Sequence, residues 1–362
     1  MKLLLSIIII TLSYSGAHSQ SKSVFYGERD LASSQKNLYL DKEGLLYPPI
    51  FIPDSSMEAS HSSLQEWYKK NESTFLEISR SYHCAFTSYT DENCFILNDS
   101  LFSSFISKTY PKEHSSATIL IHGFRKPFKR VNRDTDSPLD FATLGKTCRK
   151  YNPQTIITEV YWDGLYDCCI SASRKKNAPF FDLYAKAQLN AEKAGFSLNK
   201  IINRISYDTI TIVSHSLGAK VALYALLDIT NKGIKTPSNK RVNICLIAPA
   251  ISPEMISDNY YKRNTSIDYK KSDNYSLAIV YNERDFVLLK RIAFIGPGPL
   301  KYGVTTLGCN YRNAAIKLEK NFHALYLASS IHLYDLSFIG KCHLVSCYCY
   351  SDNLKAVFED FR

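Results

Sequence analysis

Residues 209–219 read Thr-Ile-Thr-Ile-Val-Ser-His-Ser-Leu-Gly-Ala, and this stretch decides the fold. It begins with an apolar, β-branched run, which is typical of a buried strand. The run ends in the pattern Ser-x-Ser-x-Gly, and apolar residues at helical spacing follow at once: Leu217, Val221, Ala222, Ala225 and Leu226. The stretch therefore predicts a strand, a sharp turn and a helix, with Ser216 at the turn.

Ser216 is a candidate nucleophile because of this position. A serine hydroxyl is a weak nucleophile until it is exposed, oriented and paired with a base. A strand-to-helix turn lifts the hydroxyl clear of the sheet and points the first N–H groups of the next helix at the group under attack. The usual pattern has glycine at position 214, where this chain has another small residue, Ser214. The alternative is an ordinary turn in which a serine caps the helix.

A second strand-like segment covers residues 117–124, Ala-Thr-Ile-Leu-Ile-His-Gly-Phe. Gly123 allows backbone conformations that are closed to other residues. We therefore expect the N–H of Phe124, together with the N–H of Leu217, to bind a developing oxyanion. We interpret His122 as a support for this loop rather than as a general base.

Strand-like and helix-like segments alternate along the rest of the chain. Strands are predicted over residues 155–161, 209–213, 242–248 and 276–281, and helices over 64–80 and 181–205. Such alternation predicts an α/β fold, with a mostly parallel sheet and right-handed crossovers. Two antiparallel strands are expected to open this sheet, from residues 80–98.

An acidic residue follows the last of these strands. Asp285 ends the sequence Asn-Glu-Arg-Asp, just beyond strand 276–281. An acid in this position can hold a histidine in the correct tautomer and stabilise its cation. Glu283 is the nearest alternative, and Asp285 could instead cap a following helix.

Three histidines follow the acid in sequence. We predict that His332 is the base, because it begins an apolar, helix-like segment. His323 lies in an apolar run and His343 lies among cysteines, and both stay open as alternatives.

The order Ser216, Asp285, His332, with His122-Gly123 upstream, resembles the α/β-hydrolase superfamily, and more narrowly a poorly characterised group of bacterial serine hydrolases. The resemblance covers roughly residues 115–340 and includes Ala-Pro-Ala at 248–250, where Ala250 replaces a common acidic residue. It implies a twisted, mostly parallel sheet with helices on both faces, preceded by an N-terminal extension.

The resemblance also implies a reaction: cleavage of a carboxylic ester through an acyl-enzyme on Ser216, with a small molecule or a lipid as substrate. No metal or organic cofactor is expected. Thioester, amide or peptide cleavage would use the same residues, and a binding protein that kept the fold without catalysis is the remaining alternative.

The chain opens with one lysine and about a dozen mostly apolar residues, followed by Ala-His-Ser at 17–19. This pattern predicts a signal peptide over residues 1–19, cleaved near Ser19, and hence an exported protein. Disulfides persist outside the cytosol. Of the ten cysteines, Cys84 and Cys94 are expected to close a hairpin, and Cys245 is expected to be a buried thiol. The cysteines near the C-terminus fit no strong zinc pattern.

The chain of 362 residues has a formal net charge of +10, and part of it gathers in the loop from Arg125 to Arg133. This loop could contact an anionic surface. No nucleic-acid-reading module accompanies it, so nucleic acid is not an expected partner. The oligomeric state stays open.

The expected organisation has four parts. After the signal peptide come an N-terminal extension over residues 20–114, a hydrolase core over 115–340 and a cysteine-rich segment over 341–362. Residues 164–180 and 286–305 are candidates for a cap over the site.

Overall fold

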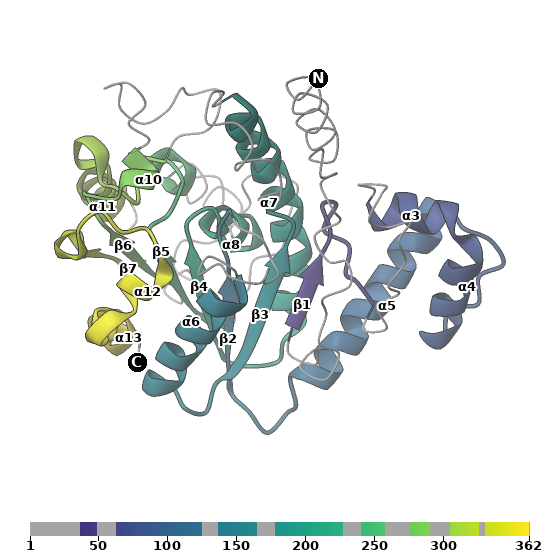
Figure 1. Cartoon of the computed structure of the whole chain (residues 1–362). Coiled ribbons are helices and arrows are strands. Elements are labelled where there is room, and N and C mark those ends of the chain that lie inside the picture. The colour runs from purple at the N-terminus through teal and green to yellow at the C-terminus, as the bar shows by residue number, and fades with distance from the viewer. Residues whose placement is uncertain are drawn as a thin grey trace, which may run out of the picture.

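The computed structural model describes residues 37–48, 63–124, 137–164, 178–226, 240–257, 275–289, 305–325 and 330–361. Its centre is a seven-stranded, all-parallel sheet in the order β1-β3-β2-β4-β5-β6-β7 (Figure 1). The strands are β1 (Asn37–Leu40), β2 (Ser116–Ile121), β3 (Ile156–Trp162), β4 (Thr209–His215), β5 (Arg241–Ile247), β6 (Tyr275–Tyr281) and β7 (Ser330–Asp335). Most strand residues are buried, and valine, isoleucine and leucine are the commonest types among them, as expected of a sheet covered on both faces. The predicted α/β class with a mostly parallel sheet is confirmed.

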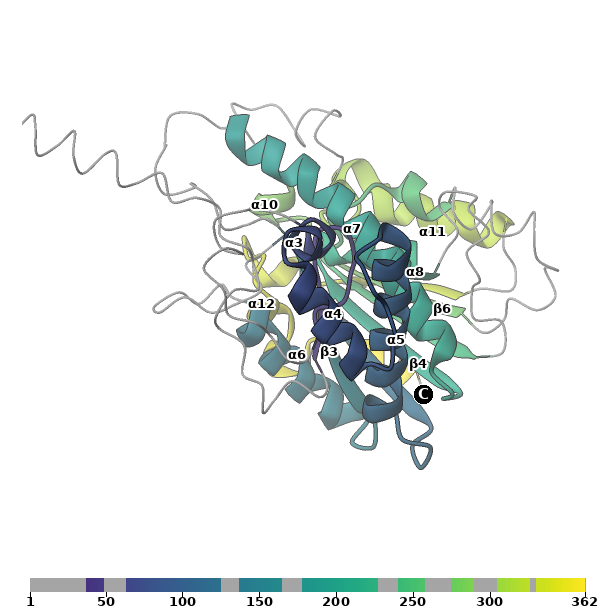
Figure 2. The same cartoon turned by 90° about the vertical axis from the view of Figure 1, so that its right-hand side faces the viewer.

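Helices cover both faces of the sheet. The long helix α7 (Ala178–Arg204) packs against α8 (Gly218–Leu226), which follows β4 directly. On the other face, α6 (Ser137–Tyr151) packs against α12 (Val345–Tyr348) and α13 (Lys355–Asp360). Figure 2 shows α6 and α12 to one side of the strands and α7 and α8 to the other.

The N-terminal helices lie beyond the β1 edge of the sheet (Figure 1). They are α3 (Leu64–Lys70), α4 (Glu72–Ser81) and α5 (Asp91–Thr109). The predicted helix over 64–80 is present but is divided at Asn71. The prediction of antiparallel strands from residues 80–98 is wrong. Thr90 caps α5, and its buried residues Cys94, Leu97 and Leu101 recur at helical spacing, so a pattern interpreted as a strand belongs to a helix.

The remaining described elements follow β6 or β7 in the chain. They are α10 (Phe286–Leu289), η4 (Tyr311–Asn313), α11 (Ala314–Leu325), η5 (Ser337–Ile339) and η6 (Tyr350–Asp352). Because every strand is parallel, the carboxyl ends of β2, β4 and β6 meet at one edge of the sheet. Ligand and catalytic sites of open parallel sheets form at this edge.

No helix among the described residues has the length and apolar character needed to cross a membrane. The predicted signal peptide and the basic loop from Arg125 to Arg133 lie outside the described residues. The same holds for most of the two segments that are candidates for a cap.

Candidate active site

The turn between β4 and α8 has the backbone of a nucleophile elbow. Ser216 has φ 53°, in the left-handed region that few residues other than glycine adopt. Its N–H donates to the carbonyl of Ile247 at 2.9 Å, and its carbonyl accepts from the N–H of Ala250 at 3.0 Å. These bonds to the end of β5 hold the serine in a conformation that costs free energy on its own.

Two glycines allow the elbow to lie close to the end of β2. A Cβ on Gly218 would lie 2.5 Å from the carbonyl oxygen of His122 and 2.8 Å from that of Ile121. A Cβ on Gly123 would lie 2.8 Å from the Cβ of Ser216. Any larger residue at either position would push the helix and the loop apart, so the two glycines fix how closely the loop approaches the serine.

Ser216, His343 and Asp285 form a hydrogen-bonded chain. The Nε2 of His343 lies 3.1 Å from the Oγ of Ser216, and its Nδ1 lies 2.6 Å from Oδ2 of Asp285. The Asp285 side chain is fully buried, and that of His343 is 11% exposed. Because an ionised carboxylate only accepts, Nδ1 carries the proton, and Nε2 is free to accept the serine proton. This is the arrangement of nucleophile, base and orienting acid.

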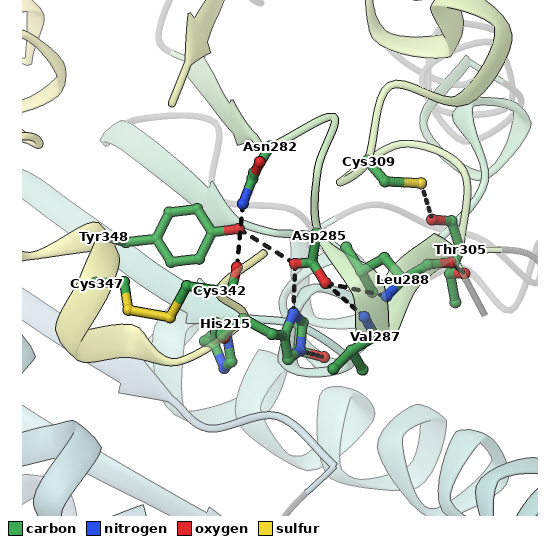
Figure 3. Close-up of polar contacts among 12 residues, drawn as sticks. His215, Asn282, Asp285, Val287, Leu288, Thr305, Cys309, Cys342, Cys347 and Tyr348 are labelled. Atoms are coloured by element: carbon green, nitrogen blue, oxygen red, sulfur yellow. Dashed lines mark hydrogen bonds and ion pairs between the residues drawn. A yellow bond between two sulfur atoms is a disulfide. The ribbon is translucent and has the colours of Figure 1, made fainter. Parts of the chain in front are cut away.

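Both carboxylate oxygens of Asp285 are engaged (Figure 3). Oδ1 accepts the N–H groups of Val287 and Leu288 at 3.0 and 3.1 Å, so the acid also caps the short helix α10. Oδ2 accepts the phenol of Tyr348 at 3.2 Å in addition to the histidine. Burial and the nearby carboxylate raise the pKa of Tyr348, which keeps its hydroxyl a donor. The contact with His343 that the predicted acid requires and the alternative helix cap therefore coexist in one residue.

The predicted position of His332 at the site is wrong. This residue lies within β7, opposite Ala278 of β6, three positions before the strand ends. Its Nδ1 lies 4.0 Å from Asp360, and its side chain is 44% exposed. The segment interpreted as the start of a helix is an edge strand, so His332 stands along the sheet rather than beyond its carboxyl end. His323, the other alternative, lies in α11.

The loop that carries His343 is fastened on several sides. A disulfide joins Cys342 and Cys347 (Figure 3). It closes a short stretch of sequence that contains His343. The side-chain amide of Asn282 donates to the carbonyls of Gly340 and Cys342, at 2.8 and 3.1 Å. These contacts hold in place a loop that has little regular structure. The sequence alone indicates only the disulfide, through the close spacing of the two cysteines.

His215 supports the same loop from the elbow. Its Nε2 donates to the carbonyl of His343 at 2.9 Å, and the two rings lie 4.8 Å apart. Asn282, Tyr348 and His215 are thus supporting residues that the sequence analysis missed. The sequence does offer one signal for His215, which directly precedes Ser216 at the end of β4. Side chains alternate along a strand, so the His215 side chain lies on the face of β4 opposite that of Ser214.

The loop after β2 is held by His122, which is buried. Its Nε2 accepts the N–H of Trp162 at 3.1 Å, and its Nδ1 contacts the carbonyl of Gly123 at 2.8 Å. These are the contacts expected of a supporting residue. Phe124 follows directly, and across the elbow the N–H of Leu217 makes no backbone hydrogen bond within the described residues.

The predicted disulfide between Cys84 and Cys94 is wrong, because both are free thiols. Cys94 is part of helix α5, and burial raises the pKa of its thiol to about 12. The Sγ of Cys84 instead lies 3.4 Å from the hydroxyl of Ser100. Cys245 is a buried free thiol, as predicted. In the described ranges no three His, Cys, Asp or Glu side chains are grouped so as to hold a metal ion.

Comparison with known proteins gives one partial similarity. The chain is 28% identical to Phospholipase A1-II 3 of Oryza sativa subsp. japonica over 120 residues. This stretch is 33% of the present chain and 26% of the rice protein, so the chain matches about a quarter of that relative's length. No family model matches the chain.

Proposed function

We propose that this protein is a serine hydrolase of the α/β-hydrolase type that cleaves carboxylic esters of lipids. The observation that carries the proposal is the chain of contacts from Ser216 through His343 to Asp285 at the carboxyl edge of the sheet. The similarity to a protein named phospholipase A1 supports an ester, and a lipid, as the substrate class.

The geometry supports a two-step reaction. His343 accepts the hydroxyl proton of Ser216 at Nε2 while Oγ attacks the ester carbonyl. The N–H groups of Phe124 and Leu217 stabilise the resulting oxyanion. The same histidine then donates its proton to the departing alcohol, which leaves the acyl group on the serine.

Hydrolysis of this acyl-enzyme repeats the transfer with water. His343 takes a proton from water, the resulting hydroxide attacks the acyl carbon, and Ser216 leaves with the proton returned by the histidine. Asp285 accepts the Nδ1 proton throughout and stabilises the imidazolium that forms in each step. Its complete burial makes this charge interaction stronger than it would be in water.

We also propose that the protein works outside the cytosol. The apolar N-terminal pattern supports export, and the Cys342–Cys347 disulfide next to the base suits an oxidising compartment. Cell fractionation with N-terminal sequencing tests this: mature protein that begins near Gln20 outside the cytosol is the expected result, and an uncleaved cytosolic chain would refute it.

Steady-state hydrolysis of a graded panel of esters, from short soluble esters to phospholipid, tests the proposed activity. Replacing Ser216 by Ala should lower kcat by about six powers of ten. The matched control is Ser214→Ala, two positions earlier in the same turn. The Ser214 hydroxyl is buried without a hydrogen-bond partner among the described residues, so its removal should leave folding and turnover intact. Equal turnover by wild type and Ser216→Ala would exclude the proposed nucleophile.

A further inference from the structure

Trp162, at the end of β3, clamps His122 at two points. The indole N–H donates to the His122 carbonyl at 2.9 Å, and the backbone N–H of Trp162 donates to Nε2 at 3.1 Å. The two rings are stacked, with centroids 5.4 Å apart and an interplanar angle of 11°. The imidazole is therefore fixed in place and in orientation.

These contacts determine which nitrogen of His122 carries the proton. A backbone N–H can only donate, so Nε2 must be the unprotonated nitrogen. In the neutral ring the proton then lies on Nδ1, and Nδ1 donates to the Gly123 carbonyl at 2.8 Å. His122 is therefore the Nδ1-protonated tautomer of the neutral imidazole.

The Gly123 carbonyl belongs to the same peptide group as the N–H of Phe124. In a trans peptide these two groups point in opposite directions. β2 lies between β3, which carries Trp162, and β4, which leads into Ser216. A carbonyl held toward the His122 ring on the β3 side therefore directs the Phe124 N–H toward the β4 side, where the nucleophile lies.

We propose that His122 is a positioning residue whose Nδ1–H holds the Gly123–Phe124 peptide in the orientation that presents the Phe124 N–H to the reacting oxygen. The inference rests on the proposed function, since it assigns part of the oxyanion site. Gly123 packs against the Cβ of Ser216, so this peptide lies beside the nucleophile. Oxyanion donors stabilise the transition state only when they are correctly placed before the charge develops. A hydrogen bond that fixes this peptide group would therefore increase the rate.

Two substitutions separate the contacts of the ring. The side-chain amide in His122→Asn can place a donor near the Nδ1 position, which retains the bond to Gly123 and loses the one to Trp162. The amide in His122→Gln can place an acceptor near the Nε2 position, which retains the bond from the Trp162 N–H and loses the one to the Gly123 carbonyl. We expect His122→Gln to lower kcat about 100-fold with little change in KM, and His122→Asn to lower it less than tenfold.

The second readout is affinity for an oxyanion-forming inhibitor such as a trifluoromethyl ketone. It should fall in parallel with kcat in His122→Gln and stay near the wild-type value in His122→Asn. Equal loss in both variants, in proportion to a lowered melting temperature, would show a structural role only and overturn the proposal.

A measurement on the wild-type protein covers the case in which either variant fails to fold. Nitrogen-15 NMR of the histidine rings should show a protonated Nδ1 and an unprotonated Nε2 for His122, and a protonated Nε2 would overturn the proposal. Fluorophosphonate labelling of Ser216 in the wild type is measured first. Absence of labelling would refute the proposed function, whereas the His122 tautomer would remain measurable independently.

Discussion

The elbow that holds Ser216 and the loop that holds His343 are joined by hydrogen bonds from Ser216 and His215 to His343, but they are built differently. Main-chain bonds to the end of β5 and two close-packed glycines fix the elbow. The loop after β7 depends on a disulfide and on two side chains, Asn282 and His215, from distant parts of the sequence. The elbow should therefore be sensitive to added volume, and the loop to side-chain and redox changes.

After loss of the nucleophile itself, the largest expected effect concerns the acid that contacts His343. Asp285→Asn should lower kcat by about four powers of ten, because an amide no longer fixes the histidine tautomer or stabilises its cation. Steady-state ester hydrolysis measures it, with Glu283→Gln as the control in the same turn. Glu283 binds the amide of Asn310 rather than the histidine, so its variant should stay near the wild-type rate. A similar loss of kcat in both variants would refute the assignment of Asp285 as the acid.

A glycine substitution tests the elbow. Gly218→Ala places a Cβ against two backbone carbonyls, so we expect a loss of about 1–3 kcal/mol in unfolding free energy. Displacement of the serine by about 1 Å should also lower kcat by about 100-fold. The control is Gly145→Ala in α6, where the nearest atom lies 3.7 Å away and helix propensity favours alanine. Unfolding curves and turnover that do not distinguish the two variants would contradict this account of the elbow.

Removal of the disulfide tests the loop. The double variant Cys342→Ser, Cys347→Ser should lose about tenfold in kcat, since Asn282 and His215 still hold the loop, and about 2 kcal/mol in unfolding free energy from the loop-closure formula. A thiol reductant should reproduce the loss in the wild type but add nothing in the variant. Cys349→Ser, at a half-buried free thiol, is the control and should be neutral. An active double variant with unchanged stability would show that the covalent link is dispensable.

The smallest effect is expected at Tyr348. Tyr348→Phe removes one hydrogen bond to Asp285 and keeps the ring, so kcat should fall by only a few-fold. Tyr350→Phe, at a residue that is 72% exposed, provides the control. A pH–rate profile should shift in Tyr348→Phe alone; identical profiles for both variants would show that the phenol does not act on the acid.

The two regions also differed in how far the sequence predicts them. The strand before Ser216 and the helix after it follow from local periodicity, as do β2, β3, β5, β6 and α7. Asp285 was found because it directly follows a strand. His343 was not preferred, because its position depends on a disulfide and on Asn282 about 60 residues earlier, which local pattern does not contain.

His332 illustrates the opposite error. Its segment is apolar with a polar residue at each end, and such short runs fit a strand as well as a helix. Placing the segment in β7 moves His332 away from the carboxyl edge and leaves the base to the following loop. The strands expected from residues 80–98 were wrong for the same reason, since the short apolar run at 94–98 does not reveal the helical period of α5.

Labelling of the purified protein with a fluorophosphonate probe, followed by peptide mapping, tests the central claim most directly. It compares the wild type with His343→Ala and His332→Ala, each shown to be folded by circular dichroism. We predict an adduct on Ser216 at the same rate in the wild type and in His332→Ala, and almost none in His343→Ala. Labelling that persists in His343→Ala and is lost in His332→Ala would contradict the assignment of the base.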